Sequence, residues 1–74
     1  MNNRQQELEE SIANDALRRA CLEYRAKHNL TQRQLAQLCR LSRDVIIKVE
    51  SAQHTSQISQ IKVYRIVQDG FLKP

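Results

Sequence analysis

The segment that most constrains the fold is residues 31–50, TQRQLAQLCRLSRDVIIKVE. Thr31 is suited to accept a hydrogen bond from an unpaired amide of a first helical turn, and Gln34 stands where it would complete a capping box. The helical spacing of apolar residues ends at Arg40, and Ser42 then offers a second N-cap. Together these features predict two short helices joined by a tight turn, which is the helix-turn-helix arrangement.

The two short helices are predicted to pack through small and aliphatic side chains. The expected apolar face of the first helix consists of Leu35, Ala36, Leu38 and Cys39. Ala36 lies where two steeply crossing helices would touch, so only a small side chain fits there. In the second helix, Ile46 and Val49 are expected to face the interior. The outward surface of that helix would then carry Asp44, Ile47 and Lys48.

The rest of the chain also favours helices. It has one Gly and one Pro among 74 residues, both near the C-terminus, so strands and hairpins are disfavoured. A chain of this length forms one domain with a modest core. We therefore expect an all-α fold, a compact bundle of four to five helices within residues 14–74, preceded by an acidic polar extension at residues 1–13.

The first helix of this domain is expected to begin after Asn14, a good N-cap residue. Its buried stripe, spaced by three and four residues, would consist of Leu17, Ala20, Cys21 and Tyr24. Asn29 is expected just beyond the helix, because Asn tolerates the left-handed conformation that ends many helices. Two interpretations of the acidic extension stay open: a solvated segment, or a helix that contacts a partner or a second subunit.

A last helix is expected at about residues 57–68, capped by Ser56 or Thr55. Its apolar residues exceed what one face of a small core can bury, so a second apolar surface is expected. The simplest use of such a surface is a self-complementary homodimer interface. The residues assigned to this interface are Ile61, Val63, Ile66, Val67 and Phe71.

The net charge of +4 is unevenly distributed along the chain. Residues 1–15 carry one base against four acids, a net −3, whereas residues 16–74 carry eleven bases against four acids, a net +7. This positive excess suits a polyanionic partner. No apolar run approaches the roughly 18 residues of a membrane span, and the N-terminus lacks the apolar stretch of a secretory signal. We therefore expect a cytoplasmic location and no membrane contact.

Catalysis and cofactor binding are not indicated by the sequence. There is no Gly-rich phosphate loop and no Ser/His/Asp set, so we expect neither enzymatic activity nor a cofactor. Cys21 and Cys39 lie on expected apolar faces and are interpreted as reduced and buried. A zinc site made from these cysteines with His28 and His54 would lack the closely spaced ligand pairs of known zinc sites, so no metal is expected.

The pattern TQxxLAxL…LSRxxIxxxE resembles the helix-turn-helix family of phage repressors, Cro proteins and XRE-type regulators, over roughly residues 17–67. The matching positions are Thr31, Gln32, Leu35, Ala36, Leu41, Ser42, Ile46, Val49 and Glu50. The chain departs from the family at Arg40 in the turn and at Ala52, where the family usually has Gly. A left-handed φ costs a non-Gly residue roughly 1 kcal/mol or more. The resemblance implies a lambda repressor-like domain that binds double-stranded DNA.

The resemblance also implies roles for particular residues. Residues 43–50 would form the recognition helix in the major groove. The residues expected to read bases are Arg43, Asp44, Ile47 and Lys48. The residues expected to contact phosphates are Thr31, Gln32, Arg33, Arg40, Gln53 and Thr55. The family further pairs a base of the first helix with the Glu that ends the recognition helix, here Arg25 and Glu50.

These features favour a homodimeric transcription regulator from a phage, plasmid or bacterium that binds a palindromic operator. It is interpreted as a repressor, with activation through polymerase contact left open. The alternative is a protein-interaction module on the same scaffold, of the antirepressor or antitoxin kind. In that case Asp44, Val45 and Ile47 would bind another protein instead of DNA.

Overall fold

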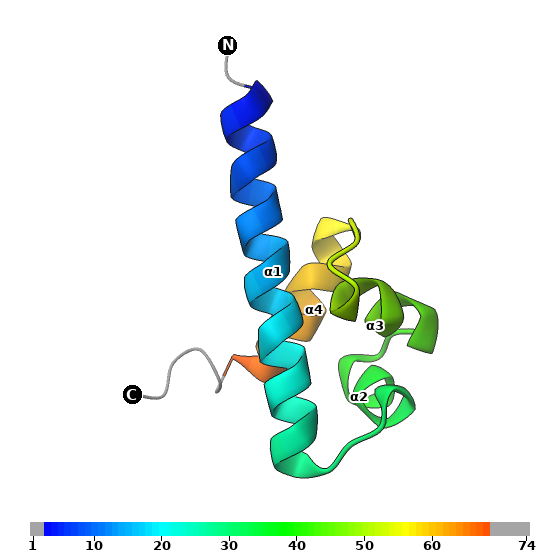
Figure 1. Ribbon diagram of the computed structural model, residues 1–74. Coiled ribbons are helices and arrows are strands. Elements are labelled where there is room, and N and C mark those ends of the chain that lie inside the picture. Colours follow the sequence, from blue (N-terminus) through cyan, green and yellow to red (C-terminus); the bar gives the residue numbers. More distant parts are fainter. Residues whose placement is uncertain (1–2, 69–74) are drawn as a thin grey trace.

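The computed structural model describes the backbone of residues 3–68 and the side chains of residues 14–68. The described residues form four helices and no strand: α1 (Asn3–His28), α2 (Gln32–Cys39), α3 (Arg43–Glu50) and α4 (Gln57–Val67). In Figure 1 the three shorter helices gather on one side of the C-terminal half of α1. The predicted all-α bundle containing a helix-turn-helix is therefore confirmed.

The first helix, α1, is longer than the sequence analysis predicts. It begins at Asn3 and continues for 26 residues, so the expectation that Asn14 caps its start is wrong. Residues 4–13 contain neither Gly nor Pro and include several strong helix formers, so the helix has no reason to begin only at residue 14. The boundary expected between extension and domain falls inside this helix. Figure 1 shows the N-terminal part of α1 projecting beyond the other helices.

The hydrophobic core lies where the four helices meet. It consists of Leu17, Ala20, Cys21, Leu35, Ala36, Cys39, Ile46, Val49, Val63 and Val67. The predicted stripe of α1 is present, with Tyr24 packed against the edge of the core. The prediction for Leu38 is wrong, because its side chain is 49% exposed. The buried residues of α2 include Leu35 and Cys39, which lie one turn apart on the side that faces the core. Leu38 lies beside this buried stripe and lines a groove next to α4.

Three helices end in a left-handed residue that is not Gly. These residues are Asn29, Arg40 and Ala52, with φ of 56°, 58° and 57°. After α2, the amide of Leu41 donates to the Ala36 carbonyl (2.9 Å) and that of Arg40 to the Gln37 carbonyl (3.2 Å), the bond pattern of a Schellman cap. The turn of the helix-turn-helix therefore forms with Arg40 in the place where Gly would be free of strain.

The predicted residues occupy the N-cap positions of α2, α3 and α4, and two of them make a capping hydrogen bond through their side chains. Thr31 forms the predicted capping box: its hydroxyl accepts from the Gln34 amide (3.0 Å), and the Gln34 side chain accepts from the Thr31 amide (2.8 Å). Ser56, not Thr55, caps α4 by accepting from the Ser59 amide. Ser42 occupies the N-cap position of α3, but its side chain makes no capping hydrogen bond.

The two cysteines are free thiols inside the core, as the sequence predicts. Burial raises the pKa of Cys21 to about 12 and that of Cys39 to about 11, so both thiols are protonated at neutral pH. Within residues 14–68, no group of three His, Cys, Asp or Glu side chains is placed to hold a metal ion. None of the described helices is both long and apolar enough to cross a membrane.

Candidate nucleic-acid interface

The outer surface of α3 carries the residues assigned to base recognition. Ile46 and Val49 are buried in the core, so the opposite side of the helix faces solvent. Arg43, Asp44 and Lys48 are exposed, and Ile47 is half-buried. None of the three charged side chains forms an ion pair with another side chain of residues 14–68. Two cations and one acid are therefore free to meet a ligand along this helix.

A polar cluster of three side chains joins α1, α2 and α3. Arg25 donates from Nε to Glu50 Oε2 (2.7 Å) and from Nη2 to Glu50 Oε1 (2.8 Å), so the predicted ion pair is present and bidentate. Gln32 donates from Nε2 to Glu50 Oε1 (2.9 Å), and a third Arg25 nitrogen donates to the Leu30 carbonyl (3.2 Å). Because Glu50 ends α3, these bonds fix the position of that helix against its two neighbours.

The electrostatics of this cluster follow from its burial. The Glu50 side chain is 5% exposed and that of Arg25 is 22% exposed. The hydrogen bonds that Arg25 donates to Glu50 raise the pKa of Arg25 above its already high ordinary value, against a smaller opposing effect of desolvation. A buried carboxylate that accepts three charged or polar hydrogen bonds is compensated, whereas the same carboxylate without Arg25 would be stranded.

Gln32 has a role that the sequence analysis does not assign to it. The family resemblance implies a phosphate contact for this residue, whereas its side-chain amide nitrogen donates to Glu50 within the protein. Gln32 is the first residue of α2, and Glu50 is the last residue of α3. The two ends meet through the packing of α2 against α3, and helical periodicity within either segment does not reveal that contact.

The remaining phosphate candidates differ in their exposure. Arg33 and Gln53 are exposed, and Thr31 is exposed although its hydroxyl caps α2. Arg40 is also exposed, but it lies at the opposite end of α2 from Arg33 and faces α4. Thr55 is 8% exposed. The prediction that Thr55 contacts phosphate is therefore wrong, because its side chain is packed inside the protein.

The predicted dimer interface of the last helix also requires correction. Val63 and Val67 have no exposed surface, because they fill the core beneath α4, so they cannot contact a partner. Ile61 is 46% exposed and Ile66 is half-buried, so both retain surface for a partner. Phe71 lies outside the described residues.

The arrangement of helices agrees with a comparison against known protein families. Residues 22–68 match a family model described as helix-turn-helix, which is more than half of the chain. The matched region contains all of α2, α3 and α4 and the end of α1 that carries Arg25. Searches of curated proteins and of solved structures gave no match.

Proposed function

This chain belongs to the XRE/Cro-C1-type helix-turn-helix family of DNA-binding domains, and we propose that it is a homodimeric repressor that binds a palindromic operator. The family match implies DNA binding and a role in transcription regulation. The observation that most supports the finer proposal is the free, cationic outer surface of α3, held in place by the Arg25–Glu50 ion pair.

Base recognition is assigned to four residues of α3. Arg43 is the first residue of the helix, and its planar fork matches O6 and N7 of guanine. Asp44 accepts from a cytosine amino group, and the exposed part of Ile47 packs on a thymine methyl group. Lys48 lies one turn after Asp44 and reaches a base or a phosphate. Each good base contact of this kind discriminates by roughly 1–3 kcal/mol.

Phosphate contacts are assigned to the N-terminal end of α2 and to the loop after α3. The unpaired amides of the first turn of α2 bind anions well, and Arg33 adds a full charge there. Thr31 and Gln53 extend this surface on either side. Such contacts orient the domain on any sequence, and each one adds about 0.9 to the slope of log affinity against log salt concentration.

We infer the homodimer from the size of the recognition helix. The eight residues of α3 span about 12 Å, enough for only a few base pairs. Two copies related by a two-fold axis would read two half-sites roughly 34 Å apart, which doubles the number of base contacts. Occupying a promoter in this way excludes polymerase without any further chemistry, and this is the mechanism of repression that we propose.

The test is selection of bound duplexes from a random pool, followed by affinity measurements on the selected site. We expect the pool to converge on a palindrome whose two half-sites are separated by one turn of DNA. Arg43→Ala should then reduce the preference for one base position, whereas Arg33→Ala should weaken binding to all duplexes and lower the salt slope. A pool that does not converge, or a selected site bound no better than random DNA, would contradict the proposal.

The protein-interaction alternative has less support. It requires a broad apolar outer surface on α3, built around Val45 and Ile47. Val45 packs against the core, and Ile47 is half-buried, so little apolar area remains. An interface of stable protein partners needs a contiguous apolar centre, whereas isolated cations suit a nucleic acid.

A further inference from the structure

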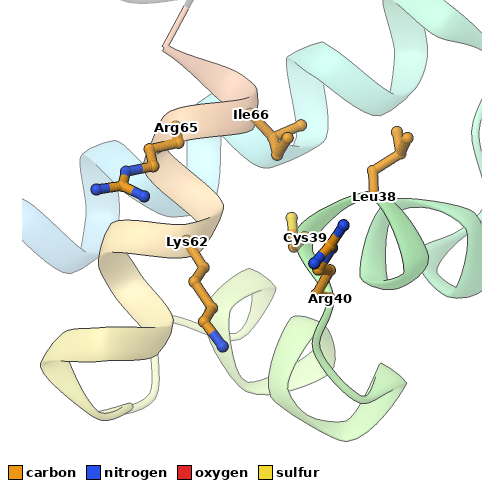
Figure 2. A pocket seen from close by; sticks show the side chains of 6 residues that line it. All are labelled: Leu38, Cys39, Arg40, Lys62, Arg65 and Ile66. Atoms are coloured by element: carbon orange, nitrogen blue, oxygen red, sulfur yellow. The ribbon is translucent and has the colours of Figure 1, made fainter.

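A groove between α2 and α4 lies at the opposite end of α2 from the proposed phosphate contacts. It is lined by Leu38, Cys39, Arg40, Lys62, Arg65 and Ile66. Figure 2 shows that α4 and the end of α2 form its two sides, with Lys62 and Ile66 on one side and Leu38 and Arg40 on the other. Among the residues expected to contact DNA, Arg40 is the one that lines this groove.

The chemistry of the groove is both cationic and apolar. Arg40, Lys62 and Arg65 are exposed, and none of them is paired with a carboxylate of residues 14–68. Leu38 keeps half of its side chain exposed, and Ile66 is half-buried. Three like charges around an apolar surface repel one another, so a ligand with acids beside aliphatic groups would relieve the repulsion and cover the apolar surface.

The chain itself contains one segment with this composition. Residues 3–12, NRQQELEESI, carry three glutamates against one arginine, together with Leu8 and Ile12. The backbone of this segment is helical, as the N-terminal part of α1. The next acid along the chain, Asp15, is already bound to Arg18 (2.9 Å) and Arg19 (2.7 Å). The acids of residues 3–12 are therefore the ones considered for the groove on the basis of their composition.

A second copy of the chain is the partner that allows this contact. The helix α1 is continuous from Asn3 to His28, and Leu17 is the first core residue among those of its side chains that are described, residues 14–28. Residue 7 therefore lies about 15 Å beyond the core along the helix axis. Figure 1 shows this end of α1 leading away from α2. The segment cannot reach the groove of its own chain without breaking the helix.

We propose that the acidic segment at residues 3–12 of one copy binds the α2–α4 groove of a second copy, and that the second copy returns the same contact. This proposal rests on the homodimer of the proposed function and identifies the surfaces that hold it together. Because the second copy returns the contact about a two-fold axis, the assembly closes at two copies. Charge pairs on a partly exposed surface make it weaken as salt rises.

The experiment is a charge exchange, measured by sedimentation of the full chain without DNA. One variant carries Glu7→Lys, Glu9→Lys and Glu10→Lys, and the other carries Lys62→Glu and Arg65→Glu. Each variant alone should bind itself about 10- to 100-fold more weakly than the parent, since two or three charge pairs become repulsive. A mixture of the two should recover the parent affinity, because both contacts of the mixed dimer are again complementary.

The control is Lys27→Glu, which reverses an exposed cation that lies outside both the groove and the proposed contacts with DNA. It should leave self-association within about twofold of the parent, as expected for surface charges away from the interface. If either charge-reversed variant fails to fold by circular dichroism, the neutral versions with Gln at the same positions replace it and should weaken association in the same direction.

Three results would overturn the proposal. These are a parent that stays monomeric, reversed variants that associate like the parent, and a mixture no tighter than its components. The outcome is separate from DNA recognition. If selected DNA is bound but the charge exchange fails, only the interface is wrong. If the exchange succeeds without any DNA preference, the proposed function is wrong and the interface stands.

Discussion

Arg25 on α1 and Glu50 at the end of α3 are joined by two hydrogen bonds of 2.7 and 2.8 Å, with the Glu50 side chain only 5% exposed. The two residues are 25 positions apart in the sequence. Their contact therefore depends on how α3 packs against the rest of the domain.

Arg25→Ala should lower the free energy of unfolding by about 3 kcal/mol, because it leaves Glu50 buried without its counter-charge. Urea denaturation of the variant and the parent measures this difference. The control is Arg19→Ala, which removes an ion pair to Asp15 whose arginine is 67% exposed. That exposed pair should contribute much less to stability than the buried pair does. Equal losses of unfolding free energy in the two variants would mean that the buried pair stabilises the protein no more than the exposed pair does.

Ala52→Gly should stabilise the protein by about 1 kcal/mol. Ala52 has φ of 57°, and a side chain in this left-handed region clashes with the following carbonyl, a strain that Gly avoids. Ala26→Gly is the matched control, because it makes the same change inside α1. It should destabilise by about 0.5–1 kcal/mol. The opposite signs, read from denaturation midpoints, separate the backbone effect from any general effect of Gly.

Local features of this chain could be predicted from the sequence, and features set by helix packing could not. The capping box of Thr31 and Gln34 depends on residues three apart, so the sequence alone identifies it. The Arg25–Glu50 pair was expected only through the family resemblance. In α4, Val63 is buried and Ile61 is exposed, and the choice between them depends on the angle at which α4 crosses α1 and α2.

The start of α1 could not be predicted for a different reason. Asn14 is a good cap residue, but an N-cap forms only where the preceding residues leave the helix, and residues 4–13 favour continuing it. The site residues divide in the same way. The exposed positions of α3 follow from its period, whereas the burial of Thr55 and the bond between Gln32 and Glu50 depend on neighbouring elements.

Leu35→Ala and Leu38→Ala should differ sharply although they make the same chemical change one turn apart. The Leu35 side chain is fully buried, so its truncation should cost about 2–5 kcal/mol of unfolding free energy through lost contacts and a cavity. Leu38 is 49% exposed, so its truncation should cost about 1 kcal/mol or less. Thermal or urea unfolding measures both. Similar losses would show that Leu38 belongs to the core after all.

Stability should fall in alkaline solution because of the buried thiols. The pKa of Cys21 is raised to about 12 and that of Cys39 to about 11, from an ordinary value of 9.0. The unfolded chain therefore releases these protons first, so the contribution of the thiols is complete below pH 9 and is lost progressively as pH rises toward 11–12. At pH 10 the loss should be about 1–3 kcal/mol for the two groups together.

The measurement for the thiols is urea denaturation at pH 8 and pH 10. Lysine and tyrosine titrate in the same range, so the parent is compared with a Cys21→Ala, Cys39→Ala variant at both pH values. The variant is expected to be less stable at pH 8, because both positions lie in the core. The unfolding free energy of the variant should fall less between pH 8 and pH 10 than that of the parent. If the unfolding free energies of parent and variant fall equally between the two pH values, the buried thiols are not the cause of the alkaline loss of stability.

Gln32→Glu should destabilise the protein more than Gln32→Ala. The Ala variant loses one hydrogen bond to a carboxylate, about 1–2 kcal/mol. The Glu variant also places a second carboxylate beside Glu50, which adds repulsion in a partly buried cluster. In a Glu50→Gln background this additional loss should disappear, because the repelling charge is gone. A double-mutant cycle measures that coupling, expected at about 0.5–3 kcal/mol for residues in contact. Zero coupling would mean that Gln32 does not act through Glu50, and it would return Gln32 to the phosphate surface that the family resemblance implies.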